Sequence, residues 1–340
     1  MFGGRYSFDA LAIWCRMIRH GHGAGLTVVR VFEMQAKNGP LGLRPAAGRI
    51  ADHLEAGGAL EDALKAEGPL LPEMFVSLAV VGERTGRMPE VFGQLEEYYR
   101  LQGQMRREFR SQAAWPVFQF VGAVLVIAFV IFIFGFLEPS AATASGPVGF
   151  GLTGTPGAIF FLLAIGTVVG GGFLAYKLVT KSVAGQAGFE AWLLKVPVFG
   201  PFVHASALSR FCLALRVTLD SSLTIGKALR MSFKATGNAA FLAQADRIVK
   251  RVNKGEELGE AMGINPIFPA EFLAMFNVGE VSGQIPEVMG RQAEFYREET
   301  ARRAKTVTKA MSWGVYGLVG IFIIVAIFRM AGVYVNALNG

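Results

Sequence analysis

The chain has 340 residues, of which 52% are hydrophobic and 17% are charged, and its formal net charge is +7. Soluble domains average about a quarter charged residues, so the composition argues against a fully water-soluble protein and favours membrane spans combined with water-exposed domains. The positive charge is better explained by the cytoplasmic flanks of membrane helices than by a nucleic-acid partner, and none is predicted. Two distant cysteines, Cys15 and Cys212, exclude a disulfide framework and a zinc site.

The first domain is expected over residues 8–115. Apolar periodicity and glycine, proline or asparagine breaks predict six helices, near residues 8–20, 26–36, 43–56, 60–67, 73–85 and 89–115. No stretch shows sustained strand alternation. The fold class predicted is therefore all-α, with this region forming an antiparallel helical bundle.

Three stretches reach the roughly 20 apolar residues that cross a bilayer. They are residues 117–137, 158–176 and 313–335. Lys and Arg flank these spans on one side only, and the loop 138–157 has neither, so the positive-inside rule places residues 1–115 and 178–312 in the cytoplasm. The N-terminus is then cytoplasmic, and the loop and the C-terminus lie outside. Arg329, near the outer end of the third span, either snorkels to the headgroups or is a functional intramembrane charge.

The second domain, residues 205–312, repeats the first. Pro72 to Arg100 matches Pro269 to Arg297 at a constant shift of 197 residues, and Cys15 matches Cys212 at the same shift. The match of Leu60 with Leu258 indicates one inserted residue. Each copy, about 110 residues long, is followed by a span. The last helix of the second copy is expected to run unbroken into the third span, whereas Pro116 predicts a kink before the first span.

Both copies carry a Gly-Glu-x-x-Gly segment followed by Pro-Glu. The motif residues are Gly82, Glu83, Gly86, Pro89 and Glu90 in the first copy, and Gly279, Glu280, Gly283, Pro286 and Glu287 in the second. The second glycine suits a left-handed helix end, and the proline suits the first position of the next helix. The first glycine permits close helix approach, and the first glutamate is placed to accept hydrogen bonds from amides at the next helix start. The motif is read as a structural αα-hairpin, with partner docking as the functional alternative. A shared cation is weaker, because no oxygen-rich loop accompanies it.

This duplicated motif, with Tyr98-Tyr99 or Phe295-Tyr296 about a dozen residues later, resembles the type II secretion system F domain. The order domain, two spans, domain, span resembles the inner-membrane platform proteins of type II secretion and type IV pilus assembly. The resemblance covers residues 8–336. It implies a non-enzymatic, multi-pass protein of the bacterial inner membrane that couples a hexameric cytoplasmic secretion ATPase to pilin-like or pseudopilin subunits. Other inner-membrane assembly proteins, membrane lipid and further copies of the chain are the remaining implied partners. Most members carry an additional N-terminal segment, whose contacts are not expected here.

Two other classes are considered. An enzyme needs a catalytic constellation, and the sequence offers no phosphate-binding loop, no His-Glu-x-x-His and no catalytic, cofactor-binding or metal-ligating candidate. A small-molecule transporter or channel component is the alternative function, but the spans carry few polar residues beyond Gln119 and Thr167. Glycine-rich faces in the second and third spans favour close helix packing instead.

Overall fold

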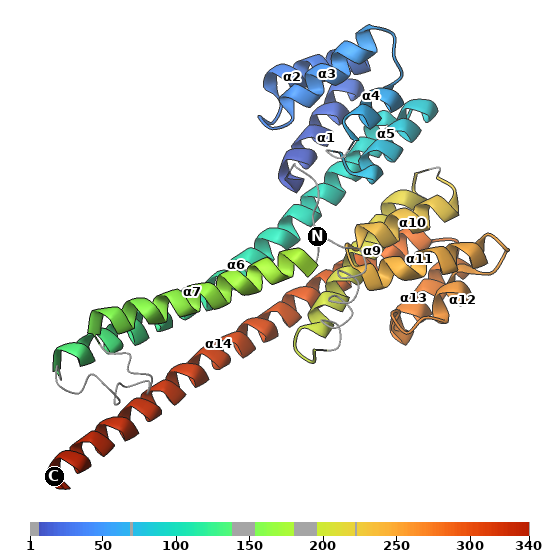
Figure 1. Ribbon diagram of the computed structural model, residues 1–340. Coiled ribbons are helices and arrows are strands. Elements are labelled where there is room, and N and C mark those ends of the chain that lie inside the picture. The colour runs from blue at the N-terminus through green and yellow to red at the C-terminus, as the bar shows by residue number, and fades with distance from the viewer. Residues whose placement is uncertain (1–6, 69–70, 138–153, 180–195, 222, 340) are drawn as a thin grey trace. The chain divides into compact units, whose positions relative to one another are not determined.

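The computed structural model describes residues 7–68, 71–137, 154–179, 196–221 and 223–339. Every regular element in these ranges is a helix and none is a strand, so the predicted all-α class is confirmed for this part of the chain (Figure 1). The chain divides into two compact units. One unit comprises Met1–Glu108 with Glu190–Arg302, and the other comprises Phe109–Phe189 with Arg303–Gly340.

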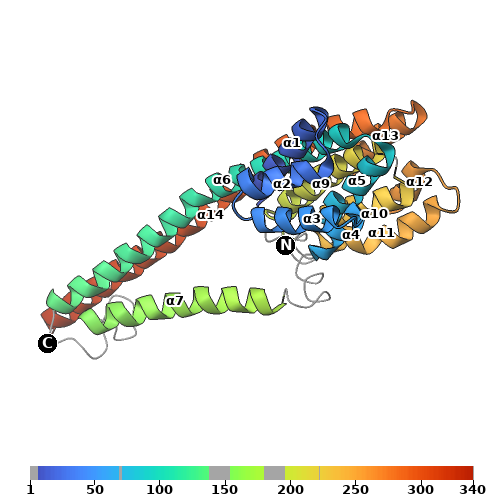
Figure 2. The ribbon, with the colours of Figure 1, turned by 90° about the horizontal axis from the view of Figure 1, so that it is seen from above.

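The first bundle lies in the first unit and consists of five helices around the start of a sixth (Figures 1 and 2). The helices are α1 Phe8–Gly23, α2 Val28–Asn38, α3 Arg44–Glu55, α4 Leu60–Ala66, α5 Glu73–Thr85 and the beginning of α6 Met88–Leu137. Two starts follow from N-capping hydroxyls, because Ser7 accepts from the amide of Ala10 and Thr27 from that of Arg30. The six helices predicted for this repeat are all present.

Aromatic side chains fill the centre of the first bundle. The ring of Trp14 stacks on that of Phe75 with centroids 5.5 Å apart, and it meets the edge of Phe32 at 5.8 Å. Phe75 in turn contacts Phe92 on α6. Cys15 is buried beside this cluster, as expected of a small core residue. Helices distant in sequence are thus held together by one apolar core.

The second bundle, also in the first unit, repeats this arrangement. Its helices are α9 Gly200–Leu219, α10 Ile225–Ala235, α11 Ala239–Val252, α12 Leu258–Gly263, α13 Ala270–Val281 and the beginning of α14 Ile285–Asn339. The bounds of α10 equal those of α2 shifted by 197 residues, and α14 begins 197 residues after α6. The pair Phe211 and Phe272, at 6.3 Å, takes the places of Trp14 and Phe75.

The second unit contains the long apolar helices. Windows within α6, α7 Gly154–Val179 and α14 are long and apolar enough to cross a membrane, and only 22%, 0% and 6% of them is buried within the protein. Their exposed apolar surface is typical of helices that face lipid. Helix α9 also meets the length and composition criterion, which makes four candidates where three were predicted. Its window, however, is 61% buried, as befits a core helix of the second bundle.

Helix α6 continues through Pro116, where a kink and a separate span were predicted. A proline has no amide hydrogen, so the carbonyl of Gln112, four residues earlier, loses its helical donor. The hydroxyl of Thr308 on α14 donates to this carbonyl at 3.5 Å. The neighbouring helix therefore supplies the missing hydrogen bond. Helix α14 is continuous, as predicted.

Two predictions fall outside the described residues. The loop predicted over 138–157 lies mostly in 138–153, and helix α7 already begins at Gly154. The side chain of Arg329 is likewise not among those described.

Candidate functional site

The repeated motif forms a tight helical hairpin in the first repeat. Helix α5 ends at Gly86, whose φ of 68° is left-handed and therefore favours glycine. The amide of Gly86 donates to the carbonyl of Glu83 at 3.2 Å, and that of Arg87 donates to the carbonyl of Gly82 at 2.9 Å. These two bonds close the helix end by the Schellman pattern and direct the chain into α6.

The second repeat makes the same turn. Gly283 has a φ of 70°, and its amide donates to the carbonyl of Glu280 at 3.2 Å. The amide of Gln284 donates to the carbonyl of Gly279 at 2.8 Å. Pro89 and Pro286 are the second residues of α6 and α14, one position later than predicted. Amides there still lack intrahelical acceptors, so proline costs no hydrogen bond.

The first glycine of each motif lies against the following helix. A Cβ added to Gly82 would stand 3.3 Å from the Cβ of Val91, and one added to Gly279 would stand 3.1 Å from the Cβ of Val288. The backbone of α14 is equally close, since the Cα of Ile285 is 3.2 Å from that added atom. Only glycine fits without displacing a neighbour.

Glu280 holds the start of α12 in place. Its two carboxylate oxygens accept from the amides of Leu258 at 2.7 Å and Gly259 at 2.8 Å. The prediction that this glutamate would bind amides at the next helix start was wrong. The amides belong to the short helix that precedes α13, because the side chain points back along its own helix. This carboxylate therefore has a structural role.

Glu83, the equivalent residue of the first repeat, is placed differently. It is exposed and, within the part of the chain that the structure describes, makes no hydrogen bond or ion pair. Partial desolvation raises the pKa of its carboxyl group above the usual value, and the nearby Glu61 acts in the same direction. The two repeats thus use the same residue differently: one carboxylate is occupied and the other is available.

The remaining motif acids, Glu90 and Glu287, are exposed in the first turns of α6 and α14, where the helix dipole favours negative charge. Among the described side chains, no group of three His, Cys, Asp or Glu residues gathers as a metal ligand set. The hairpins therefore present single carboxylates to solvent.

Contacts between the two repeats were missed by the sequence reasoning. Arg19 lies over Gly93 and pairs with Glu96 at 3.2 Å, within the first repeat. Arg216, its equivalent, lies over Gly290, but the position of Glu96 is taken by an alanine in the second repeat. Arg216 instead approaches Glu97 of the first repeat at 3.6 Å. Comparing the repeats residue by residue would have exposed this change of partner.

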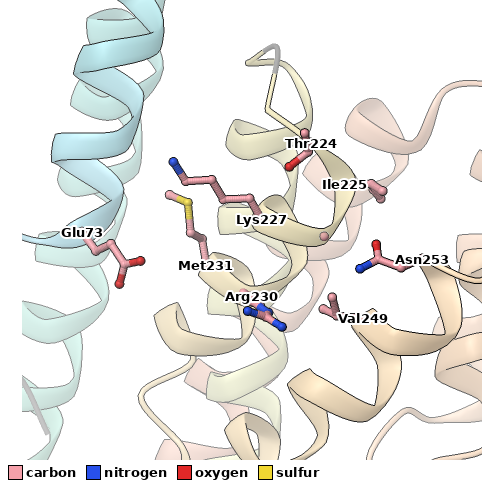
Figure 3. A pocket seen from close by; sticks show the side chains of 9 residues that line it. Glu73, Thr224, Ile225, Lys227, Arg230, Met231, Val249 and Asn253 are labelled. Atoms are coloured by element: carbon pink, nitrogen blue, oxygen red, sulfur yellow. The ribbon is translucent and has the colours of Figure 1, made fainter. Parts of the chain in front are cut away.

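A pocket of about 430 Å³ lies where the repeats meet (Figure 3). Glu73, on α5 of the first repeat, faces α10 of the second across it, where the side chains of Lys227 and Met231 point towards α5. Lys234, further along α10, forms an ion pair with Glu73. The contact between the repeats is thus partly apolar and partly charged.

Comparison with known proteins agrees with the duplicated architecture. The family model described as "Type II secretion system (T2SS), protein F" matches residues 14–136 and again residues 211–331. Type IV pilus assembly protein PilC of Pseudomonas aeruginosa is 23% identical over 92% of this chain and 86% of its own length. PilC of Thermus thermophilus is 25% identical over 88% of the chain and 76% of its own length.

Type II secretion system protein F of Pseudomonas aeruginosa is 23% identical over 72% of the chain and 62% of its own length. The family match covers more than half of the residues and falls once on each repeat together with the apolar helix that follows it. The chain therefore belongs to the family of the type II secretion system protein F, with two copies of the family domain and helices apolar enough to span the bacterial inner membrane.

Proposed function

We propose that this protein is the inner-membrane assembly platform of a type II secretion or type IV pilus machine. The observation that carries the proposal is the double family match, in which each F domain runs into an apolar helix. The names of its relatives, which belong to both kinds of machine, support the same role. The platform acts by binding and transmitting motion rather than by catalysis. It couples a hexameric cytoplasmic secretion ATPase to the assembly of pilin-like subunits.

The proposed topology places both helical bundles in the cytoplasm. Basic residues precede the apolar parts of α6 and α14, among them Arg107, Arg110, Arg303 and Lys309, and all four are exposed. A cytoplasmic leaflet rich in anionic lipid attracts such residues. The N-terminus is then cytoplasmic and the C-terminus external, and the ATPase meets the bundles directly.

Within the motif, we assign partner docking to the first repeat. Glu83 and Glu90 are both exposed, and Glu83 has no partner among the described residues. Glu280 is occupied by the amides of α12. A partner that presents lysine or arginine side chains would pair with Glu83 and relieve its partial desolvation without breaking a bond in the platform.

The test is capture of the full chain from its native cell. A cytoplasmic affinity tag, gentle crosslinking, detergent extraction and mass spectrometry would identify the associated proteins. We expect a hexameric secretion ATPase together with pilin-like subunits, and the pilin types would identify the machine. Recovery of the chain with a solute-binding protein instead would refute the platform role and support a transporter.

A charge-reversed variant tests the docking residues. Glu83→Lys combined with Glu90→Lys is expected to lower ATPase recovery several-fold. The matched control is Asp52→Lys, which makes the same change on an exposed residue of α3. Equal recovery from the variant and the control would place the docking surface elsewhere while leaving the platform role intact.

A further inference from the structure

The contact between the two repeats gives each a different environment. In the chain, α5 of the first repeat meets α10 of the second through the Glu73–Lys234 ion pair and the pocket beside Met231 (Figure 3). Met231 is only 5% exposed. Helix α10 therefore has a covered outer face, and part of the cover comes from the other repeat.

The equivalent surfaces on the outer sides of the pair have no such cover. Met34 on α2, the equivalent of Met231, is 41% exposed. On α13, the equivalent of α5, Met275 is 43% and Val278 is 58% exposed, whereas Leu78, at the place of Met275, is fully buried. Val281 is 90% exposed, where the first repeat has Arg84 paired with Glu61. We call these surfaces the α2 face and the α13 face.

An apolar stripe of this kind at the spacing i, i+3, i+6 on a surface helix is typical of a contact site. The occupant is indicated by the repeat itself. Within the chain, the surface equivalent to the α13 face docks on the surface equivalent to the α2 face. We infer that the α13 face of one chain docks on the α2 face of a second copy, so that the contact between repeats within a chain is repeated between chains.

Charge complementarity supports this pairing. Lys37 on α2 stands at the position of Lys234, which binds Glu73 within the chain. On α13, Ala270 occupies the position of Glu73, but Glu271 follows immediately, and both Glu271 and Lys37 are exposed. The pair Lys37–Glu271 would therefore replace the pair Lys234–Glu73 at the rim of the intermolecular contact.

The contact is heterologous, because each chain contributes two different faces. Every chain retains one free face of each kind, so copies add head to tail until a ring closes. The inference concerns how copies associate and does not depend on the proposed function. A platform without this contact would still bind its ATPase, and the contact would exist whatever machine the protein serves.

Mixed-chain crosslinking tests the inference in the full-length protein in its native membrane. Two differently tagged chains are co-expressed, one carrying Met34→Cys and the other Val278→Cys, and are treated with a short bis-maleimide. Cys15 and Cys212 can remain, because both are fully buried and burial raises the pKa of both thiols. We expect dimers that carry both tags, and chains that carry both substitutions should form ladders longer than a dimer.

The matched control replaces Val278→Cys by Leu242→Cys, on α11, which is 46% exposed in the same bundle. Docked thiols are held at high effective concentration, so the mixed dimer should exceed this control at least about tenfold. A yield no higher than the control would overturn the inference. So would predominant linking of Val278→Cys chains to one another, because that product requires a two-fold contact.

A charge swap checks the register. Lys37→Glu on the first chain, or Glu271→Lys on the second, should lower the mixed-dimer yield about two- to fivefold, and both together should restore it. These residues are exposed, so the variants are expected to fold. Loss without restoration would overturn the assigned register and the interface with it.

Discussion

The two equivalent glutamates of the motif provide a prediction with an internal control. Glu280→Gln keeps the length of the side chain but leaves one oxygen to serve the amides of Leu258 and Gly259, with an NH₂ group facing the other amide. A hydrogen bond to a charged group contributes about 1.5–3 kcal/mol, and a helix cap contributes about 0.5–2 kcal/mol. We expect the start of α12 to lose about 2 kcal/mol of local stability.

Hydrogen exchange measured by mass spectrometry on the full chain in lipid nanodiscs reports this loss directly. Protection of an amide scales with the free energy of local opening, so about 2 kcal/mol corresponds to about 30-fold faster exchange in peptides that cover α12. Glu83→Gln is the control, because Glu83 makes no bond in the described structure. It should change exchange at α4 by less than about twofold.

The refuting results are equally local. If Glu280→Gln left the protection of α12 unchanged, its carboxylate would not be holding that helix. If Glu83→Gln accelerated exchange at α4 as strongly as Glu280→Gln does at α12, the two repeats would not differ in the way described, and the assignment of Glu83 to docking would fail.

Three further predictions concern the core of the bundles. Gly82→Ala and Gly279→Ala should each destabilise their own repeat by about 1–3 kcal/mol, because the added methyl group meets the next helix; local hydrogen exchange should rise in that repeat alone, and equal effects in both would contradict this. Trp14→Ala should cost about 3–5 kcal/mol, seen as a lower unfolding temperature, because the ring is fully buried between aromatic neighbours. The thiols of Cys15 and Cys212 should remain neutral and unlabelled by iodoacetamide at pH 8–9, where an ordinary thiol with a pKa of about 8.5 reacts, since burial raises the pKa of both; complete labelling before denaturation would refute their burial.

The duplication made much of the fold predictable. Once the first repeat was divided into helices, the shift of 197 residues placed the helices of the second, and α2 and α10 have the same bounds at that shift. The left-handed turns at Gly86 and Gly283 were predictable because the glycine, the preceding helix and the following proline are local signals.

Features that depend on another part of the chain were not predictable in this way. The acceptor role of Glu280 was foreseen but its partner was not, because the amides lie 21 and 22 residues earlier in the sequence. Arg216 changes its partner because of a substitution at a distant position, Ala293 in place of glutamate. Pro116 is a kink signal by local rules, yet a hydroxyl from α14 compensates for it. In each case tertiary contact decides the outcome.

The hydrogen bond between Thr308 and the carbonyl of Gln112 also fixes how α14 can slide along α6 in the second unit. A displacement of one helical turn, about 5.4 Å, brings a residue four positions away to the same carbonyl. In one direction that residue is Ser312, whose hydroxyl can take over the bond. In the other it is Ala304, which has no donor and would leave the carbonyl unsatisfied at a cost of about 1–3 kcal/mol. The proline and the two hydroxyl residues therefore make axial motion of this helix pair directional, easier one way than the other.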